Sequence, residues 1–140
     1  MVIKMFRGEF GFLSNFYECE IKYCSLRFKN LEACFQALKS KDWNVRKMFE
    51  NLDGKSAKAL GRKISLREDW SDIREKVMEY LVKVKFSNEY LKNKLLSTGD
   101  AVLIEGNYWN DRFWGVDLKS GLGENRLGKI LMKVRDELRG

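Results

Sequence analysis

The sequence predicts an α+β fold in a single domain over residues 1–140, mostly helical with a few short strands. A length of 140 residues suits one domain. Apolar residues recur at helical spacing through much of the chain after residue 30, whereas the alternating βαβ units of a doubly wound sheet are missing. The hydrophobic fraction of 44% supplies a core and excludes a disordered chain, and without proline or repeats nothing marks a domain boundary.

The N-terminal third is expected to hold a short hairpin followed by a helix. Residues 19–23 and 25–28 alternate enough to indicate the two strands. Asn30 is a good N-cap for a helix whose apolar residues recur at i, i+3, i+4 and i+7. That stripe consists of Leu31, Cys34, Phe35 and Leu38.

Helical spacing continues through the middle of the chain. A second helix is expected to end at Asp53 and Gly54, and a shorter one covers about residues 56–62. The longest helical pattern covers about residues 69–85. The expected stripe of the second helix is Val45, Met48, Phe49 and Leu52, and that of the longest is Trp70, Ile73, Val77, Leu81 and Val84.

The C-terminal part is expected to add a helix, a strand and a final helix. Asn88 caps a helix that runs to about residue 96 and stops at the sequence TGD, residues 98–100. Residues 101–104 are apolar and indicate a short buried strand. After a glycine-rich turn, the last helix buries Leu127, Ile130, Leu131, Val134 and Leu138.

The chain contains no histidine, which excludes Ser-His-Asp triads, Cys-His pairs and histidine-ligated metals. The three cysteines, Cys19, Cys24 and Cys34, lack the spacing of metal ligands. We therefore expect no metal and no cofactor, and any acid–base chemistry must use carboxylates, lysine, tyrosine or cysteine. With no apolar run long enough for a membrane span or signal peptide, the expected location is the reducing cytoplasm, away from membranes.

The formal net charge of +7 suits a partner that carries phosphate. Residues 31–65 hold eight Lys and Arg against four Asp and Glu, which is more than half of the surplus. Within that stretch, Glu32, Gln36 and Lys39 share one helix face at i, i+4 and i+7. They are either parts of a site or an ordinary solvated face whose first-turn acid is favoured by the helix dipole.

A second group of candidates lies in residues 105–115, where two acids, two asparagines and four aromatic residues are crowded together. Rings that stack on a flat base, beside acids that bind ribose hydroxyls, would form a nucleoside pocket. The alternative is structural: Trp109 and Trp114 would fill the core, and Asp111 would form an Asx turn.

Other segments offer hydrogen-bond donors for a phosphorylated ligand. Lys58 and Arg62 flank Gly61 in a basic helix that is otherwise an ordinary solvated helix end. Ser14 and Asn15, and Asn125 in the glycine-rich segment 121–128, lie in polar loops that equally suit plain turns.

These segments, in this order, resemble the NADAR (YbiA-like) family over nearly the whole chain. The matching segments are LSNF at 13–16, LEACFQALK at 31–39, AKALGR at 57–62, LLSTGD at 95–100, DRFWG at 111–115, NRLG at 125–128 and LMKVR at 131–135, with Trp70, Lys85, Phe86 and Glu105. The resemblance implies an N-glycosidase acting on phosphorylated ribosyl or ADP-ribosyl substrates. These are ribosylamino-pyrimidine phosphates of riboflavin synthesis or ADP-ribosylated guanine, including guanine in nucleic acid. Many relatives carry polar residues where this chain has Cys34 and Phe35, which bears on substrate choice.

The resemblance also implies roles for individual residues. Glu32 would activate water or stabilise the developing cation, Asp111 would hold ribose hydroxyls or act as second acid, and Trp114 would stack; the two acid roles can be exchanged. The expected substrate-binding residues are Ser14, Asn15, Lys39, Lys58, Arg62 and Asn125. The alternative function is a basic module that binds ADP-ribose or nucleic acid without turnover. A purely structural protein would leave the aromatic and acidic loop unexplained.

Overall fold

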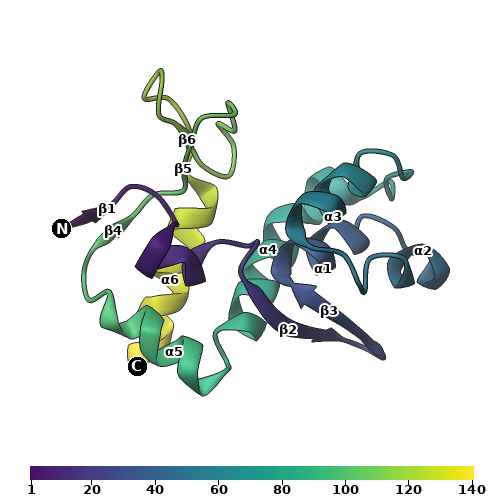
Figure 1. Cartoon of the computed structure of the whole chain (residues 1–140), viewed down its shortest axis with the longest axis horizontal. Coiled ribbons are helices and arrows are strands. Elements are labelled where there is room, and N and C mark those ends of the chain that lie inside the picture. Colours follow the sequence, from purple (N-terminus) through teal and green to yellow (C-terminus); the bar gives the residue numbers. More distant parts are fainter. The chain divides into compact units, whose positions relative to one another are not determined.

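The computed structural model describes all of residues 1–140 and divides them into two units (Figure 1). Residues 15–85 form the central unit, and residues 1–14 with residues 86–140 form the terminal unit. The predicted α+β class, with more helix than strand, is confirmed. A single domain over residues 1–140 stays a prediction.

The central unit begins with the predicted hairpin. Strand β2 (Glu18–Tyr23) pairs antiparallel with β3 (Leu26–Asn30), and Cys24 in the turn between them takes a left-handed conformation with φ of 53°. On β3, alternate residues are buried, and its last residue, Asn30, is one of them. The first helix begins at the next residue, so its start is buried as well. The sequence therefore predicted this hairpin correctly.

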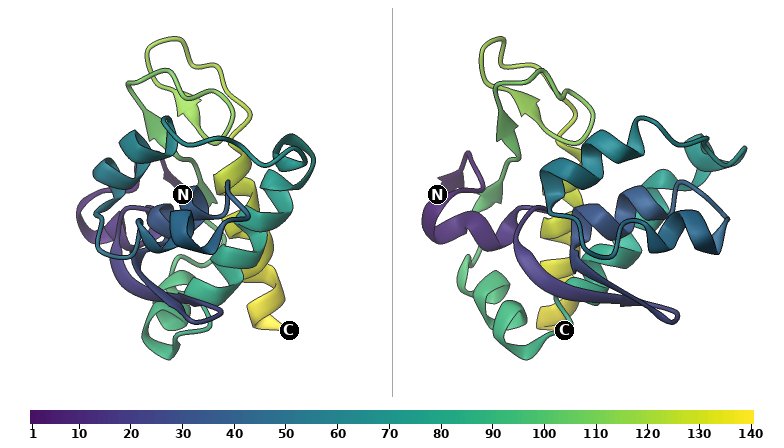
Figure 2. Two further views of the ribbon diagram at one scale, coloured as in Figure 1. Left: turned by 90° about the vertical axis from the view of Figure 1, so that its right-hand side faces the viewer. Right: turned by 45° about the vertical axis from the view of Figure 1, so that its right-hand side comes forward.

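Four helices complete the central unit: α1 (Leu31–Ala37), α2 (Trp43–Lys47), α3 (Gly54–Gly61) and α4 (Trp70–Lys85). Helix α1 packs against both α3 and α4, and all of its residues are buried (Figures 1 and 2). A helix buried on every side has no solvated face. Its polar residues therefore lie inside the unit, where they need partners.

Three expectations for these helices are corrected. Helix α2 is shorter than its apolar spacing indicated. The Asp42 carboxylate caps its start by accepting from the Asn44 amide, and the helix ends at Lys47, before Met48, which is 55% exposed. Helix α3 begins at Gly54 because the Asp53 carboxylate accepts from the Ser56 amide. The buried face of α4 is rotated from the expected stripe; it consists of Trp70, Met78, Leu81, Val82 and Lys85.

The terminal unit consists of two short strand pairs and of helices that pack in sequence on one another. Strand β1 (Val2–Ile3) pairs parallel with β4 (Val102–Leu103), and β5 (Gly106–Asn107) pairs parallel with β6 (Val116–Asp117). The 3-10 helix η1 (Gly8–Leu13) packs against α5 (Glu89–Ser97), and α5 packs against α6 (Arg126–Arg139). The β5–β6 pair and its loops lie beyond the N-terminal end of α6 (Figure 2).

Most expectations for the terminal unit are confirmed. Asn88 caps α5 through the Leu91 amide, and β4 lies within the predicted strand. Helix α6 buries the expected residues except Leu138, which is half-buried, and it also buries Arg135. None of the helices combines the length and apolar character needed to cross a lipid bilayer.

A buried lysine in the central unit leads to a prediction about stability. Lys85 is 2% exposed, with its ammonium 5.5 Å from the centre of the Tyr17 ring. Burial lowers the pKa of Lys85 from 10.5 to about 8, against a smaller opposing effect of Cys19. Between these values the unfolded chain binds a proton that the native protein lacks, so this group's contribution to stability rises with pH.

We therefore expect Lys85→Met to be more stable than wild type at pH 7, by roughly 2–4 kcal/mol, and this difference to shrink as the pH rises from 8 towards 10.5. Urea unfolding of both proteins at several pH values measures it. The control is Lys83→Met, because Lys83 on the same helix is 46% exposed. A stability difference for Lys85→Met that does not change between pH 8 and 10.5 would show that burial does not lower the pKa of Lys85.

Candidate active site

Glu32 owes its position to the start of helix α1. The Asn30 side chain accepts from the Ala33 amide at 2.8 Å and donates to the Leu52 carbonyl at 3.0 Å, so it fixes where the helix begins. The Glu32 amide donates to the Asn15 carbonyl at 3.0 Å. Glu32 is only 8% exposed, so the structure holds a carboxylate inside the protein at a helix N-terminus.

Gln36 lies one turn further along α1 and contacts this carboxylate directly. Its Nε2 donates to Glu32 Oε2 at 2.6 Å, and Gln36 is itself 5% exposed. The interpretation of this face as ordinary and solvated is therefore wrong for both residues. A buried carboxylate is costly unless it has such partners.

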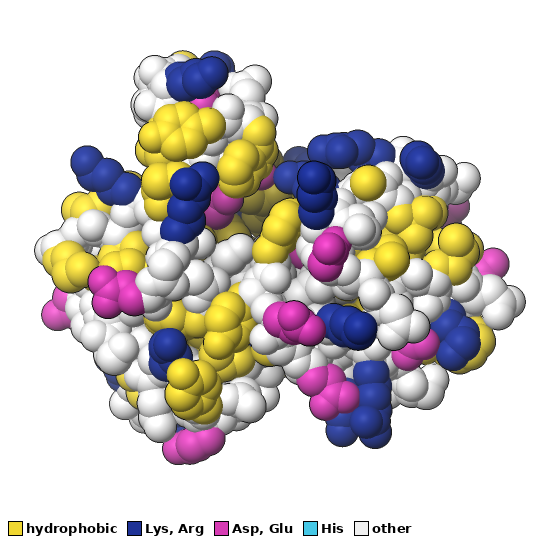
Figure 3. Space-filling view, viewed as in Figure 1, with side chains coloured by type: hydrophobic (Ala, Val, Ile, Leu, Met, Phe, Trp, Pro, Cys, Tyr) yellow, Lys and Arg dark blue, Asp and Glu magenta, His cyan; other side chains and the backbone are white.

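Lys39 lies near Glu32, and Lys58 and Arg62 lie near Lys39, all within the central unit. Burial lowers the pKa of Lys39, Glu32 acts against this, and Arg62 and Lys58 lower the pKa further. Lys39 and Lys58 are half-buried and Arg62 is exposed. Lys and Arg side chains gather over α3 (Figure 3). Three cations, two of which lower the pKa of the third, suit an anionic ligand.

The two predicted donors before the hairpin contribute differently. Asn15 presents its carbonyl to Glu32, and its side-chain amide lies 3.5 Å from the Met78 sulfur. Ser14 belongs to the terminal unit and ends η1, with its amide donating to the Gly11 carbonyl. Asn15 therefore supports the Glu32 backbone, and ligand binding by either side chain stays a prediction.

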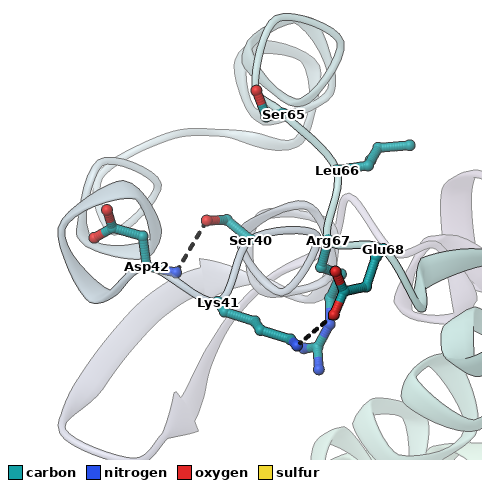
Figure 4. Close-up of a pocket in the computed structure, with 7 residues that line it drawn as sticks. All are labelled: Ser40, Lys41, Asp42, Ser65, Leu66, Arg67 and Glu68. Carbon is teal, nitrogen blue, oxygen red and sulfur yellow. Dashed lines mark hydrogen bonds and ion pairs between the residues drawn. The ribbon is translucent and has the colours of Figure 1, made fainter.

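A polar cavity of about 360 Å³ opens in the central unit beyond the end of α1 (Figure 4). It is lined by Ser40, Lys41, Asp42, Ser65, Leu66, Arg67 and Glu68. Lys41 and Glu68 pair across it at 3.6 Å, and its two cationic side chains are balanced by two acidic ones. None of the predicted site residues lines it, so this cavity is separate from the group of Glu32, Lys39, Lys58 and Arg62.

In the terminal unit, Asp111 organises the loop between β5 and β6. Its Oδ1 accepts from the amides of Phe113 and Trp114 at 3.1 and 3.0 Å, which is an Asx turn. Trp109 is 58% exposed, so the interpretation that it fills the core is wrong. Trp114 is half-buried, with its ring edge-on to Phe113 at 4.8 Å.

Asn107, the last residue of β5, supports this loop and was not singled out by the sequence. It is completely buried, and its Oδ1 accepts from the Asp111 amide at 2.9 Å. Its Nδ2 donates to the Asp111 carbonyl at 3.0 Å and to Glu105 Oε2 at 3.1 Å. One side-chain amide on β5 thus contacts both Glu105, just before the strand, and Asp111, in the loop after it. Only its place after a buried strand and a glycine could have indicated this role.

Asn125 bridges two backbone segments of the terminal unit. It has a left-handed φ of 51°, accepts from the Glu105 amide at 3.0 Å and donates to the Leu103 carbonyl at 2.9 Å. The side-chain oxygen and one side-chain N–H of Asn125 are therefore already hydrogen-bonded to the backbone. The structure thus gives Asn125 a supporting position at the start of α6, and its predicted contact with substrate stays a prediction.

The structure brings the candidates together as two groups. Glu32, Lys39, Lys58 and Arg62, with Asn15, form the group in the central unit. The group in the terminal unit consists of Glu105, Asn107, Asp111, Trp114 and Asn125.

Comparison with known proteins identifies the family. The NADAR domain family matches residues 4–139, nearly the whole chain. The chain belongs to the NADAR family. An NMR structure of the protein YbiA from Escherichia coli superposes with a TM-score of 0.85, at 31% identity, covering 99% of this chain and 84% of that one.

Two curated proteins extend the NADAR comparison. The N-glycosidase YbiA of Escherichia coli is 35% identical over 93% of this chain and 82% of its own length. A riboflavin biosynthesis protein of Vibrio vulnificus is 42% identical over 91% of this chain. This chain spans only 35% of the Vibrio protein's length.

Proposed function

We propose that this protein is an N-glycosidase that hydrolyses the ribose C1′–N bond of a phosphorylated ribosyl or ADP-ribosyl substrate. The observation that carries the proposal is the buried Glu32, which is hydrogen-bonded to Gln36 and lies near Lys39, itself close to Lys58 and Arg62. The name of the Escherichia coli relative, N-glycosidase YbiA, supports the same reaction.

The chemistry requires a carboxylate but no imidazole. Cleavage of a ribose C1′–N bond passes through an oxocarbenium-like transition state, which a fixed negative charge stabilises. Glu32 supplies that charge or activates the attacking water. Lys39, Lys58 and Arg62 neutralise the phosphate of the substrate. Recognition of the substrate therefore does not depend on a charge on the leaving base.

Two substrate classes fit. The Vibrio relative is named a riboflavin biosynthesis protein, and ribosylamino-pyrimidine phosphates are the substrate class that belongs to that synthesis. ADP-ribosylated guanine, free or in nucleic acid, suits the same cations and the net charge of +7. Three free cysteines agree with a reducing cytoplasm.

Incubation with a panel of substrates tests the proposal. The panel contains ADP-ribosylated guanosine and DNA, free ADP-ribose, NAD and ribosylamino-pyrimidine phosphates, and mass spectrometry detects any released base or sugar. Release from one class supports the reaction and names the substrate. A ligand that binds but returns intact would instead favour the alternative of a binding module.

Arg62 provides a test of phosphate recognition. We expect Arg62→Ala to raise KM for the phosphorylated substrate by about 10- to 100-fold, a loss of about 1.5–3 kcal/mol for a charge-assisted hydrogen bond, with kcat nearly unchanged. The control is Lys63→Ala, another exposed cation one residue further along. Unchanged kinetics with a lower Tm would make Arg62 a structural residue.

We also expect activity to be independent of metal, since the chain lacks histidine and its cysteines lack ligand spacing. Turnover measured in excess EDTA should equal turnover without it. Loss in EDTA with recovery on adding Mg²⁺ would mean that the acids hold a metal, with Asp111 and Glu105 the first residues to examine.

A further inference from the structure

We propose that Gln36 is a positioning residue for Glu32, and that Gly61 of α3 holds Gln36 in the orientation this requires. The inference rests on the proposed function, in which Glu32 acts on substrate. It adds two residues to that function, one on each of two packed helices.

The state of the Gln36 side chain is unusual. Its Nε2 donates to Glu32 Oε2 at 2.6 Å, while its Oε1 is buried without a hydrogen-bond partner. A buried acceptor without a partner costs stability, and such groups in native proteins call for an explanation. Here the amide gives up one possible hydrogen bond and keeps its N–H directed at the carboxylate.

Gly61 explains why the amide stays in that orientation. A Cβ at position 61 would overlap Gln36 Oε1 and lie 2.7 Å from Gln36 Cδ, so only glycine allows α3 to approach this closely. Gly61 has no positive φ, so its backbone does not require glycine. Because alanine is the better helix former, the glycine here serves the contact with Gln36.

The contact fixes the carboxylate in turn. Glu32 and Gln36 are one turn apart on α1, the spacing at which helical side chains meet. With Gly61 behind it, the amide has no room to turn away, so Glu32 is held in one rotamer. A reacting carboxylate loses much of its effect when displaced by about 1 Å.

A spectroscopic test needs no substrate, because Gln36 is the only glutamine in the chain. Labelling with glutamine enriched in ¹⁵N at the side-chain amide therefore gives one pair of NMR signals. In wild type we expect two well-separated, slowly exchanging protons. Gly61→Ala should bring the pair close to the positions of a free amide and speed exchange. An unchanged pair in Gly61→Ala would overturn the inference.

The matched control is Gly54→Ala, at the other end of α3. A Cβ at position 54 would lie 2.6 Å from Phe16 Cδ1 rather than against Gln36. Gly54→Ala should therefore lower Tm but leave the labelled amide signals in place. Loss of these signals in Gly54→Ala would mean that they report general loosening.

Kinetics on a substrate that wild type cleaves test the role itself. Gln36→Ala and Gly61→Ala should each lower kcat by about 10- to 100-fold, with KM within about threefold. Removing the amide makes room for a Cβ at position 61, so the double variant should match Gln36→Ala. Two losses that multiply, or wild-type kcat in Gln36→Ala, would overturn the inference. If wild type cleaves nothing in the panel, the proposed function fails and the labelled amide alone decides whether Gly61 holds Gln36.

Discussion

Glu32→Gln is expected to lower kcat by at least about 100-fold while the protein folds and still binds its ligand. The substitution keeps the size of the side chain and an oxygen that accepts from Gln36 Nε2, but it removes the negative charge. One acid–base group contributes about 10²–10⁴-fold, and stabilisation of a developing cation can add as much. KM should change little, because the cations that hold phosphate remain.

The measurement is steady-state turnover of whichever substrate the panel identifies, with ligand binding and Tm recorded for the same variant. The control is Glu20→Gln, a surface carboxylate of the same unit that pairs with Arg27. Near wild-type turnover in Glu32→Gln would refute the assignment. It would transfer the catalytic role to Asp111 or Glu105 in the terminal unit.

The start of α1 shows what sequence reasoning can predict. Asn30 has the right chemistry for an N-cap, and spacing alone puts Glu32 and Gln36 on one face. The prediction was wrong for Lys39, which lies beyond the end of α1 at Ala37. What spacing cannot show is whether that face is solvated. Burial of the whole helix depends on α3 and α4, and the close approach of α3 depends on Gly61.

Helix α4 shows a different limit. Its sequence contains two overlapping apolar stripes, and the structure buries the one that includes Met78 and Lys85. Periodicity analysis counts lysine as polar, so it selects the other stripe. A long aliphatic stem allows Lys85 to pack as an apolar residue, and this is visible only once its neighbours are known.

The contacts that hold the β5–β6 loop could not be predicted from the sequence, for a third reason. Aromatic rings and acids stand out in a sequence, whereas the loop depends on Asn107, which belongs to no periodic pattern. Asp111 was correctly suspected of forming an Asx turn, since Asp does so often. Which buried amide completes such a turn is settled by contacts several residues away.

Asn107→Ala is expected to destabilise the protein by about 2–4 kcal/mol. The fully buried side chain satisfies the Asp111 amide and carbonyl, at 2.9 and 3.0 Å, and the carboxylate of Glu105. Each buried group left without a partner costs about 1–3 kcal/mol, and water entering the space recovers part of this. In a chain of this size, the loss corresponds to a fall in Tm of roughly 10 °C.

Thermal unfolding measures the loss, and amide hydrogen exchange locates it. Exchange should quicken at Asp111, Phe113 and Trp114, whose amides belong to the Asn107 network and its Asx turn, while α1 keeps its protection. Asn93→Ala is the control, because Asn93 is exposed on α5 and alanine suits a helix. A change in Tm as small as that of Asn93→Ala would mean that the loop holds its shape without the buried amide. The β5–β6 pairing and the Asx turn would then suffice to place Asp111 and Trp114.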